Sequence, residues 1–324
     1  MSTVAKHSGV SIAAVSRVLL GDARAREETV QRVMESARTV GDRLNGAARA
    51  LVTQRHGTIA AVFPTVSGHS YAGVILGLEE ASIALGQSVL IAGTYGGPCS
   101  EELVSALATR VDGLVLFGRT VSDRMVLELE ARRVPVVLLA RPQVGSAIAV
   151  RAENRRSAQA LTAHLIGHGH DRIAFVGDPC ASPDAAERWA GYGDAHREAG
   201  IRPPMAPEVC GFREADGRRS ALQALTRGPA PAALFCASDE IAMGAYAAAA
   251  ELGVAVPEEV AITGWDDIPI ARFLSPALTT VRQPLAEMGA RAAHLLSAAI
   301  EHRPFVGEVA PLPTELFIRA SCGC

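Results

Sequence analysis

From residue 58 onward, the pattern of apolar and polar positions predicts an α/β fold. Short, continuous apolar runs alternate with longer segments in which apolar residues recur at helical spacing. Strands that are apolar throughout and alternate with helices are typical of parallel sheets covered on both faces. The runs expected to be strands are Thr58–Phe63, Val89–Ala92, Leu114–Phe117, Val136–Leu139, Ile173–Val176, Ala233–Cys236 and Val260–Thr263.

This region also repeats itself at an offset of 114 residues. In both copies an apolar strand is followed by a loop, a helix and a glycine, and six identities in one ordered unit favour a duplication. The matched pairs are Ile59 and Ile173, Ala60 and Ala174, Val62 and Val176, Gly77 and Gly191, Ala81 and Ala195, and Gly86 and Gly200.

The first forty residues have a helical period and predict a helix-turn-helix. A short apolar helix around Val4 and Ala5 ends at Gly9, and Ser11 is well placed to cap a second helix. The core-facing stripe of that helix is Val15, Val18 and Leu19. Its other face, which can enter a major groove and reach base edges, carries Ile12, Ala13, Ser16 and Arg17.

A third helix is expected to open near Glu27 and Glu28, because acidic residues suit a helix N-terminus. It closes a three-helix core with Val30, Val33, Met34 and Ala37. The spacing alone is also compatible with a helical bundle that does not bind DNA.

Charge separates the two regions. Residues 1–56 carry a net charge of +4, which leaves −7 on the remainder of a chain whose total is −3. A basic end on an acidic body is typical of a phosphate-contacting module attached to a ligand-binding module.

The order of residues is more specific than their spacing. Gly-Val-Ser at residues 9–11, followed by Val-Ser-Arg-Val-Leu at 15–19, resembles the headpiece of the lactose-repressor (LacI/GalR) family of bacterial transcription regulators. Asn-Gly-Ala-Ala-Arg-Ala-Leu at 45–51 is similar to that family's hinge helix, and the resemblance covers essentially the whole chain. Relatives have several residues before the position of Thr3, so the natural start is expected to lie upstream or the headpiece to be weakened.

The resemblance implies an all-α headpiece joined to a two-lobed α/β core like that of type I periplasmic binding proteins. The expected boundaries are 1–44 for the headpiece, 45–57 for the hinge helix and linker, 58–155 with 285–319 for the first lobe, and 156–284 for the second. The implied function is an effector-controlled repressor of carbohydrate-related genes that binds double-stranded operator DNA. The DNA-contacting residues are then Ser11, Ile12, Ala13, Ser16, Arg17, Asn45, Ala48 and Leu51.

The effector site is expected where the carboxyl ends of the strands in the two lobes face each other. The candidates there offer aromatic faces, arginine forks and carboxylates, which suit a polyhydroxylated ligand. They are Ser70, Tyr71, Arg119, Arg188, Phe212, Asp239, Trp265 and Asp266. Carried over from the family's motifs, Arg188, Phe212 and Asp266 are the implied ligand contacts.

Each candidate also has a structural interpretation. Tyr71 and Phe212 could be core aromatics, Arg188 a surface residue, and Asp239 a helix-capping acid. Relatives often place Asp at the position of Ala140 and Asn at that of Ser238. With Arg119 near the cleft, this favours an anionic ligand such as a sugar acid.

Composition narrows the remaining possibilities. No apolar run approaches the roughly 20 residues that a membrane span requires, and the N-terminus lacks a signal-peptide core, so a cytoplasmic protein is expected. We expect no cofactor, no catalytic residues and no metal. His164 and His168 lack the Glu of the metalloprotease pattern, and Cys322 and Cys324 offer two ligands at an end expected to fray.

Two alternative functions are a periplasmic-type sugar-binding protein and an enzyme built on the α/β lobes. The basic headpiece disfavours the first, and the absence of a phosphate loop or nucleophile elbow disfavours the second. The stretch Leu285–Ile300 is predicted to be a helix packed on the first lobe. No leucine heptad follows Arg319, so a homodimer is expected.

Overall fold

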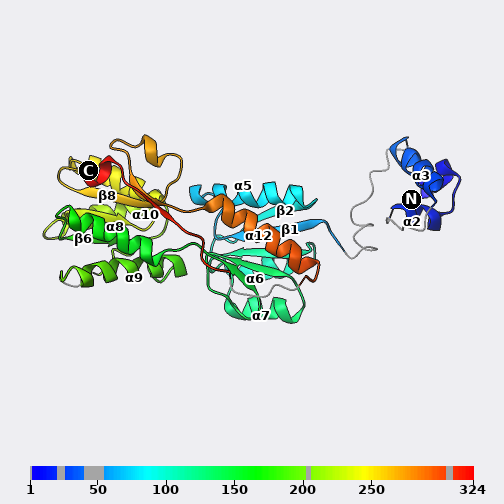
Figure 1. Ribbon diagram of the computed structural model, residues 1–324, viewed down its shortest axis with the longest axis horizontal. Helices are drawn as coiled ribbons and strands as arrows, with labels where there is room; N and C mark the ends of the chain where they lie inside the picture. The colour runs from blue at the N-terminus through cyan, green and yellow to red at the C-terminus, as the bar shows by residue number, and fades with distance from the viewer. Residues whose placement is uncertain (1, 20–25, 40–54, 202–205, 304–308) are drawn as a thin grey trace.

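The predicted alternation of strands and helices is present in the computed structural model of the chain, which describes residues 2–19, 26–39, 55–201, 206–303 and 309–324. A three-helix headpiece precedes two α/β lobes, each built on a five-stranded sheet (Figure 1). Among the described residues, no helix is long and apolar enough to cross a membrane.

The headpiece consists of α1 (Ser2–Ser8), α2 (Ile12–Leu19) and α3 (Glu27–Thr39). Gly9 has a φ of +67°, which ends α1 in a tight turn. The buried centre contains Val4, Ala5, Val15, Val18 and Val33, with Val30 and Ala37 partly buried against it. The expectation for Met34 is wrong, because its side chain is exposed on the outer side of α3.

The first lobe has the sheet order β2-β1-β3-β4-β5, with all pairs parallel. Alternate residues of β1 point to opposite faces: Ile59 packs under α5 and α12, and Ala60 under α6 and α7. The elements are β1 (Thr58–Phe63), α5 (His69–Ala84), β2 (Ser88–Gly93), α6 (Ser100–Leu107), β3 (Gly113–Phe117), α7 (Asp123–Ala131), β4 (Val136–Leu139), β5 (Ile148–Val150) and α12 (Leu285–Ile300).

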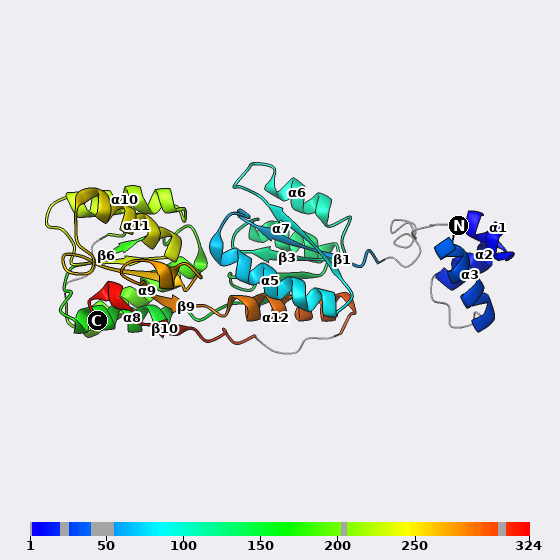
Figure 2. The same cartoon turned by 90° about the horizontal axis from the view of Figure 1, so that it is seen from above.

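The second lobe has the order β10-β9-β8-β7-β6, and its edge strand β10 is antiparallel to β9. Helices α8 and α9 cover one face of the sheet and α10 and α11 the other (Figure 2). The elements are α8 (Arg155–Gly167), β6 (Ile173–Val176), α9 (Pro183–Glu198), α10 (Glu214–Thr226), β7 (Ala233–Cys236), α11 (Asp239–Leu252), β8 (Ala261–Asp266), η1 (Ala271–Phe273), β9 (Thr279–Arg282), β10 (Glu315–Phe317) and η2 (Ala320–Cys322).

The chain therefore crosses between the lobes three times: after β5, after β9 and before β10. The third crossing corrects the expected boundary at residue 319, because β10 already belongs to the second sheet. The end of the chain is not frayed either, since η2 packs on the second lobe and Cys322 is fully buried.

The expected duplication is visible in the packing of two glycines. A Cβ on Gly77 of α5 would lie 1.9 Å from the Ala286 carbonyl oxygen of α12, and one on Gly191 of α9 would lie 2.0 Å from the Arg155 carbonyl oxygen of α8. In both lobes, the glycine of the repeated unit lets two helices pack with their backbones in contact. Gly86 and Gly200, with φ of +70° and +65°, then end the repeat.

Candidate functional site

Helix α2 presents the predicted DNA-contacting face to solvent. Ser11 caps the helix, since its Oγ accepts the backbone N–H of Ala14 at 3.1 Å. Ile12 is 55% exposed, and Ala13 and Arg17 are also exposed. Ser16 is partly exposed. Asn45, Ala48 and Leu51 lie outside the described residues.

Two polar contacts join helices α1 and α3 of the headpiece. Arg32 donates to the Ser8 carbonyl oxygen at 3.0 Å, and His7 Nδ1 lies 3.2 Å from Ser36 Oγ. These contacts join α1 to α3, and the outer face of α2 has no partner among the described residues.

A pocket of about 240 Å³ lies between the two lobes. It is formed at the carboxyl ends of β1 and β3 on one side and of β7 and β8 on the other. Six of the eight predicted effector residues line it: Ser70, Tyr71, Arg119, Arg188, Phe212 and Asp266.

Arg188 of α9 is the best-anchored charge in this pocket. Its Nε donates to Asn154 Oδ1 at 2.8 Å, its Nη1 donates to the Ala237 carbonyl oxygen at 2.6 Å, and its guanidinium lies 4.6 Å from the centre of the Trp265 ring. Asn154 is fully buried in the first crossing between the lobes. Arg188 is therefore fixed in position by three contacts. Through Asn154, it joins the wall of the pocket to the first crossing between the lobes.

Two carboxylates flank Arg188. Burial raises the pKa of both Asp184 and Asp266 to about 6, although the charge of Arg188 acts in the opposite direction. Asp266 also has a φ of +113°, an unfavourable backbone conformation for a residue other than glycine. The turn at the end of β8 thus places the Asp266 carboxylate at the pocket at two costs: the charged group loses contact with water, and its backbone adopts an unfavourable φ.

Gln283, which the sequence analysis missed, lies on the same wall. Its Nε2 donates to Asp266 Oδ1 at 2.6 Å. Its Oε1 is buried and has no hydrogen-bond partner among the described residues. Because a buried polar atom normally has a partner, this carbonyl oxygen is free to accept a hydrogen bond from a ligand.

The first lobe contributes an aromatic wall. The Tyr71 ring lies 5.3 Å from that of Phe63 and 5.0 Å from that of Phe117, centre to centre. Burial, followed by the charges of Asp266 and Glu240, raises the pKa of Tyr71 to about 12, so its hydroxyl stays a neutral donor. Tyr71 combines both of its expected roles, because it packs on the core and lines the pocket.

Two exposed arginines lie across the pocket from each other. Arg119 follows β3 in the first lobe, and Arg213 precedes α10 in the second. Neither side chain has an ion pair or hydrogen bond within the described part of the chain. They are therefore available to an anionic group.

The expectation that Asp239 and Trp265 line the pocket is wrong. Asp239 is fully buried behind the wall, where Thr280 Oγ1 donates to it at 2.6 Å and the Ile268 N–H at 2.8 Å. Trp265 is also fully buried, and its ring packs against the guanidinium of Arg188 on the side away from the pocket. Lining residues that were not selected from the sequence include Asp184, Arg213, Glu240 and Gln283, whereas Ser238, which follows β7, lines the pocket as its position at a strand end suggested.

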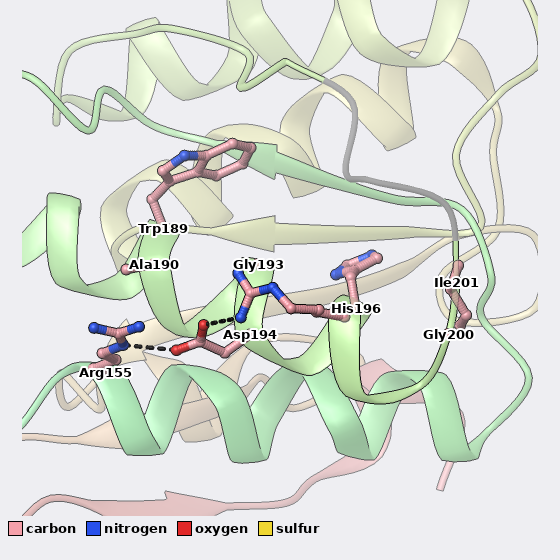
Figure 3. Close-up of a pocket in the computed structure, with 9 residues that line it drawn as sticks. Arg155, Trp189, Ala190, Gly193, Asp194, His196, Gly200 and Ile201 are labelled. Atoms are coloured by element: carbon pink, nitrogen blue, oxygen red, sulfur yellow. Dashed lines mark hydrogen bonds and ion pairs between the residues drawn. The ribbon is translucent and has the colours of Figure 1, made fainter.

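A second pocket, of about 510 Å³, lies on the second lobe beside α9 (Figure 3). Its wall carries an exposed ion-pair network in which Asp194 accepts from Arg155 at 2.6 Å and from Arg197 at 2.7 Å. Those hydrogen bonds lower the pKa of Asp194 to about 2. Among the described residues that line it, the charged groups Arg155, Asp194 and Arg197 are paired with one another, so this part of the second pocket offers no converging free charges like those of the interlobe pocket.

Comparison with known proteins agrees with both parts of this description. Residues 1–41 match the family described as "Bacterial regulatory proteins, lacI family", and residues 162–322 match the "Periplasmic binding protein-like domain". The HTH-type transcriptional regulator GalR of Escherichia coli (strain K12) is 30% identical over 307 residues, which cover 93% of this chain and 89% of GalR.

Two solved structures match along the full length. The transcriptional regulator CelR–cellobiose complex has a TM-score of 0.74 at 29% identity, covering 98% of both chains. The Lac repressor dimer bound to operator and the anti-inducer ONPF has a TM-score of 0.83 at 25% identity, covering 98% of this chain and 97% of that one. A headpiece and a two-lobed body like those described here thus occur together in single proteins.

Proposed function

The chain belongs to the lacI family of bacterial regulatory proteins, and we propose that it is a repressor whose operator affinity is controlled by a small anionic sugar bound between its lobes. The observation that carries the proposal is the pairing of two separate surfaces in one chain. One is the unpartnered outer face of α2, and the other is an interlobe pocket around the anchored guanidinium of Arg188.

We propose that helix α2 recognises the base sequence of the operator. Arg17 is positioned to make a bidentate contact to a guanine, with Ile12 and Ala13 setting the preference at neighbouring bases. We propose that the hinge segment with Asn45, Ala48 and Leu51 also contacts the operator, with Leu51 wedged between base pairs in the minor groove.

The ligand class follows from the groups that converge on the pocket. Tyr71 and Phe212 offer ring faces to C–H groups, Gln283 Oε1 accepts from a hydroxyl, and Asp266 can accept from another. The guanidinium groups of Arg119 and Arg213, which have no ion pair among the described residues, can bind a carboxylate or a phosphate of the ligand. A volume below the roughly 300–1,000 Å³ typical of drug-sized ligands suits a ligand of monosaccharide size.

A homodimer is proposed from the outer face of the first lobe. Large apolar side chains are exposed there on α5, on the edge strand β2 and in the residues just after each, and exposed apolar residues that gather in one region mark an interaction surface. They are Leu76 and Ile83 on α5, Leu85 after it, Leu90 and Ile91 on β2, and Tyr95 after it.

We propose that the pocket binds its ligand without transforming it. A sugar-binding protein with no role on DNA remains the alternative, and it predicts ligand binding without selection of any duplex.

The test has two arms on the purified full chain. A thermal-shift screen against sugars, sugar phosphates and sugar acids should give stabilisation by an anionic sugar, because a ligand that binds the folded state raises the melting temperature. Selection from a random duplex pool should yield a near-palindromic site. Arg17→Ala should weaken binding to it by about 1–3 kcal/mol, whereas Arg227→Ala on the second lobe should not. Failure to select any sequence, or turnover of the bound sugar, would refute the proposal.

A further inference from the structure

A separate cluster of ligating side chains joins the end of the chain to α8. His164 lies on α8 and His168 caps the C-terminal end of that helix, one turn later. Cys322 belongs to η2, and Cys324 follows it by two residues. Cys324 Sγ lies 3.2 Å from His164 Nε2, 3.4 Å from His168 Nε2 and 3.0 Å from Cys322 Sγ. Cys322 Sγ in turn lies 3.5 Å from His164 Nε2.

The nitrogen–sulfur separations are close to those of ligands around one small cation, whereas the two sulfur atoms, 3.0 Å apart, would move apart on binding it. Zn²⁺ bound to nitrogen at about 2.0–2.1 Å and to sulfur at about 2.3 Å in a tetrahedron spaces its ligand atoms about 3.3–3.8 Å apart. The nitrogen–sulfur distances of 3.2–3.5 Å fall close to this range. One ligand atom from each of His164, His168 and Cys324 lies within 4.8 Å of the other two, and Cys322 contacts two members of this trio.

We propose that His164, His168, Cys322 and Cys324 form a Zn²⁺ site that fastens the C-terminal end of the chain to the second lobe. Two imidazoles and two thiolates are a donor set that Zn²⁺ prefers for closed, structural sites. On binding, each thiol releases its proton to solvent and each imidazole binds through a neutral ring nitrogen.

Surrounding groups hold the Cys322 side chain in place. It is fully buried, and its Sγ lies 3.1 Å from Thr279 Oγ1 and 3.2 Å from the Arg319 carbonyl oxygen, to which the thiol donates. Thr279 Oγ1 itself accepts the Arg319 N–H at 2.8 Å, and His170 Nε2 lies 3.4 Å from the Cys322 carbonyl oxygen. Hydrogen bonds of this kind orient metal ligands and tune their basicity.

The sequence analysis expected no metal here because each pair of ligands, taken alone, is incomplete. The two pairs are about 160 residues apart in the sequence, and they meet because the chain returns to the second lobe at the third crossing. Leu312 in that crossing exchanges backbone hydrogen bonds of 2.8 Å with Arg151 and Glu153 of the first crossing. A cation at the cluster would thus secure the last segment of chain that spans both lobes.

The experiment uses the untagged full chain, reduced, stripped with a chelator and incubated with Zn²⁺ or Co²⁺ alone. Elemental analysis should find one Zn²⁺ per chain after dialysis, with a higher melting temperature than the stripped protein. Bound Co²⁺ should show the visible bands of a tetrahedral site and a thiolate charge-transfer band. Cys324→Ser and His168→Ala, both at exposed positions, should weaken Zn²⁺ affinity by at least about 10- to 100-fold.

Matched controls are Cys99→Ser and His294→Ala, which change an exposed thiol and an exposed helical histidine elsewhere. Both should bind Zn²⁺ like the unsubstituted chain. Reduced, folded protein that stays metal-free overturns the proposal, as does Zn²⁺ binding that survives both Cys324→Ser and His168→Ala. A Cys322–Cys324 disulfide that forms in the stripped protein, with no Zn²⁺ bound after reduction, would likewise replace the metal site with a redox pair.

Discussion

Glu240 and His69 connect the two lobes across the mouth of the interlobe pocket. Glu240 Oε1, at the start of α11, accepts the His69 backbone N–H at 2.5 Å and lies 3.2 Å from His69 Nδ1. His69 begins α5 in the first lobe, so the carboxylate also faces the N-terminus of that helix. This contact favours the arrangement in which the lobes face each other around the pocket.

Removing its charge should shift the lobes toward an open arrangement. Glu240→Gln is expected to increase the radius of gyration of the ligand-free protein in small-angle scattering and to weaken ligand binding about two- to ten-fold, since the pair is partly exposed. Glu287→Gln on α12 is the control. Weaker binding with an unchanged radius of gyration would instead make Glu240 a direct ligand contact.

Two neighbouring aspartates should respond differently to the same substitution. Asp266 faces the pocket, whereas Asp267 pairs with Arg319 at 2.7 Å and with Arg282 at 2.6 Å. Asp266→Asn should weaken ligand binding about 10- to 100-fold, the loss of a charge-assisted hydrogen bond, without lowering the melting temperature at neutral pH. Asp267→Asn should lower the melting temperature and leave ligand affinity nearly unchanged. Calorimetric titration and thermal unfolding separate the two, and the reverse outcome would move the site.

The buried aspartates also predict a pH dependence of stability. Their folded-state pKa of about 6 lies above the ordinary value of 3.8, so the folded protein holds these protons more tightly than the unfolded chain. Each group therefore contributes stability that is present below pH 4 and is lost as the pH rises to about 6, on the order of 1–3 kcal/mol. Asp184→Asn should thus be more stable, relative to the unsubstituted protein, at about pH 7.5 than at about pH 5. A stability difference that does not change with pH would contradict this.

Helix packing supplies a prediction with an internal control. Gly191→Ala should destabilise the second lobe by about 1–3 kcal/mol, because its Cβ would overlap the Arg155 carbonyl oxygen. Gly193→Ala, two residues further along α9, meets nothing within 4 Å and should be neutral or stabilising by up to about 1 kcal/mol. Thermal unfolding measures both. Equal effects would show that the close approach of α8 and α9 is not what requires Gly191.

Much of the fold followed from hydrophobic pattern because the core strands are apolar throughout. Thr58–Phe63 and Val136–Leu139 match the observed strands residue for residue. The strands β5 and β10 were missed because three residues are too few for a hydrophobic pattern to show. The strand β9 was missed because three of its four residues, Thr279, Thr280 and Arg282, are polar.

The site was harder to predict because strand ends do not reveal which way a side chain turns. Asp239 and Asp266 both follow apolar runs, yet Asp239 turns inward to Thr280 while Asp266 faces the pocket. Gln283 carries no motif of its own and matters only because its amide meets Asp266. Such assignments depend on tertiary contacts between residues far apart in the chain.

The central claim is that one chain couples ligand binding in the interlobe pocket to operator binding through α2. The most direct test is titration of the selected duplex by the unsubstituted protein and by Asp266→Asn, each with and without the most stabilising sugar of the screen. We predict a shift in operator affinity of about 5- to 150-fold for the unsubstituted protein. Asp266→Asn should bind the duplex within a few-fold of the unsubstituted protein and show no shift. An equal shift in both proteins, or no shift at saturating sugar in the unsubstituted protein, would contradict the account.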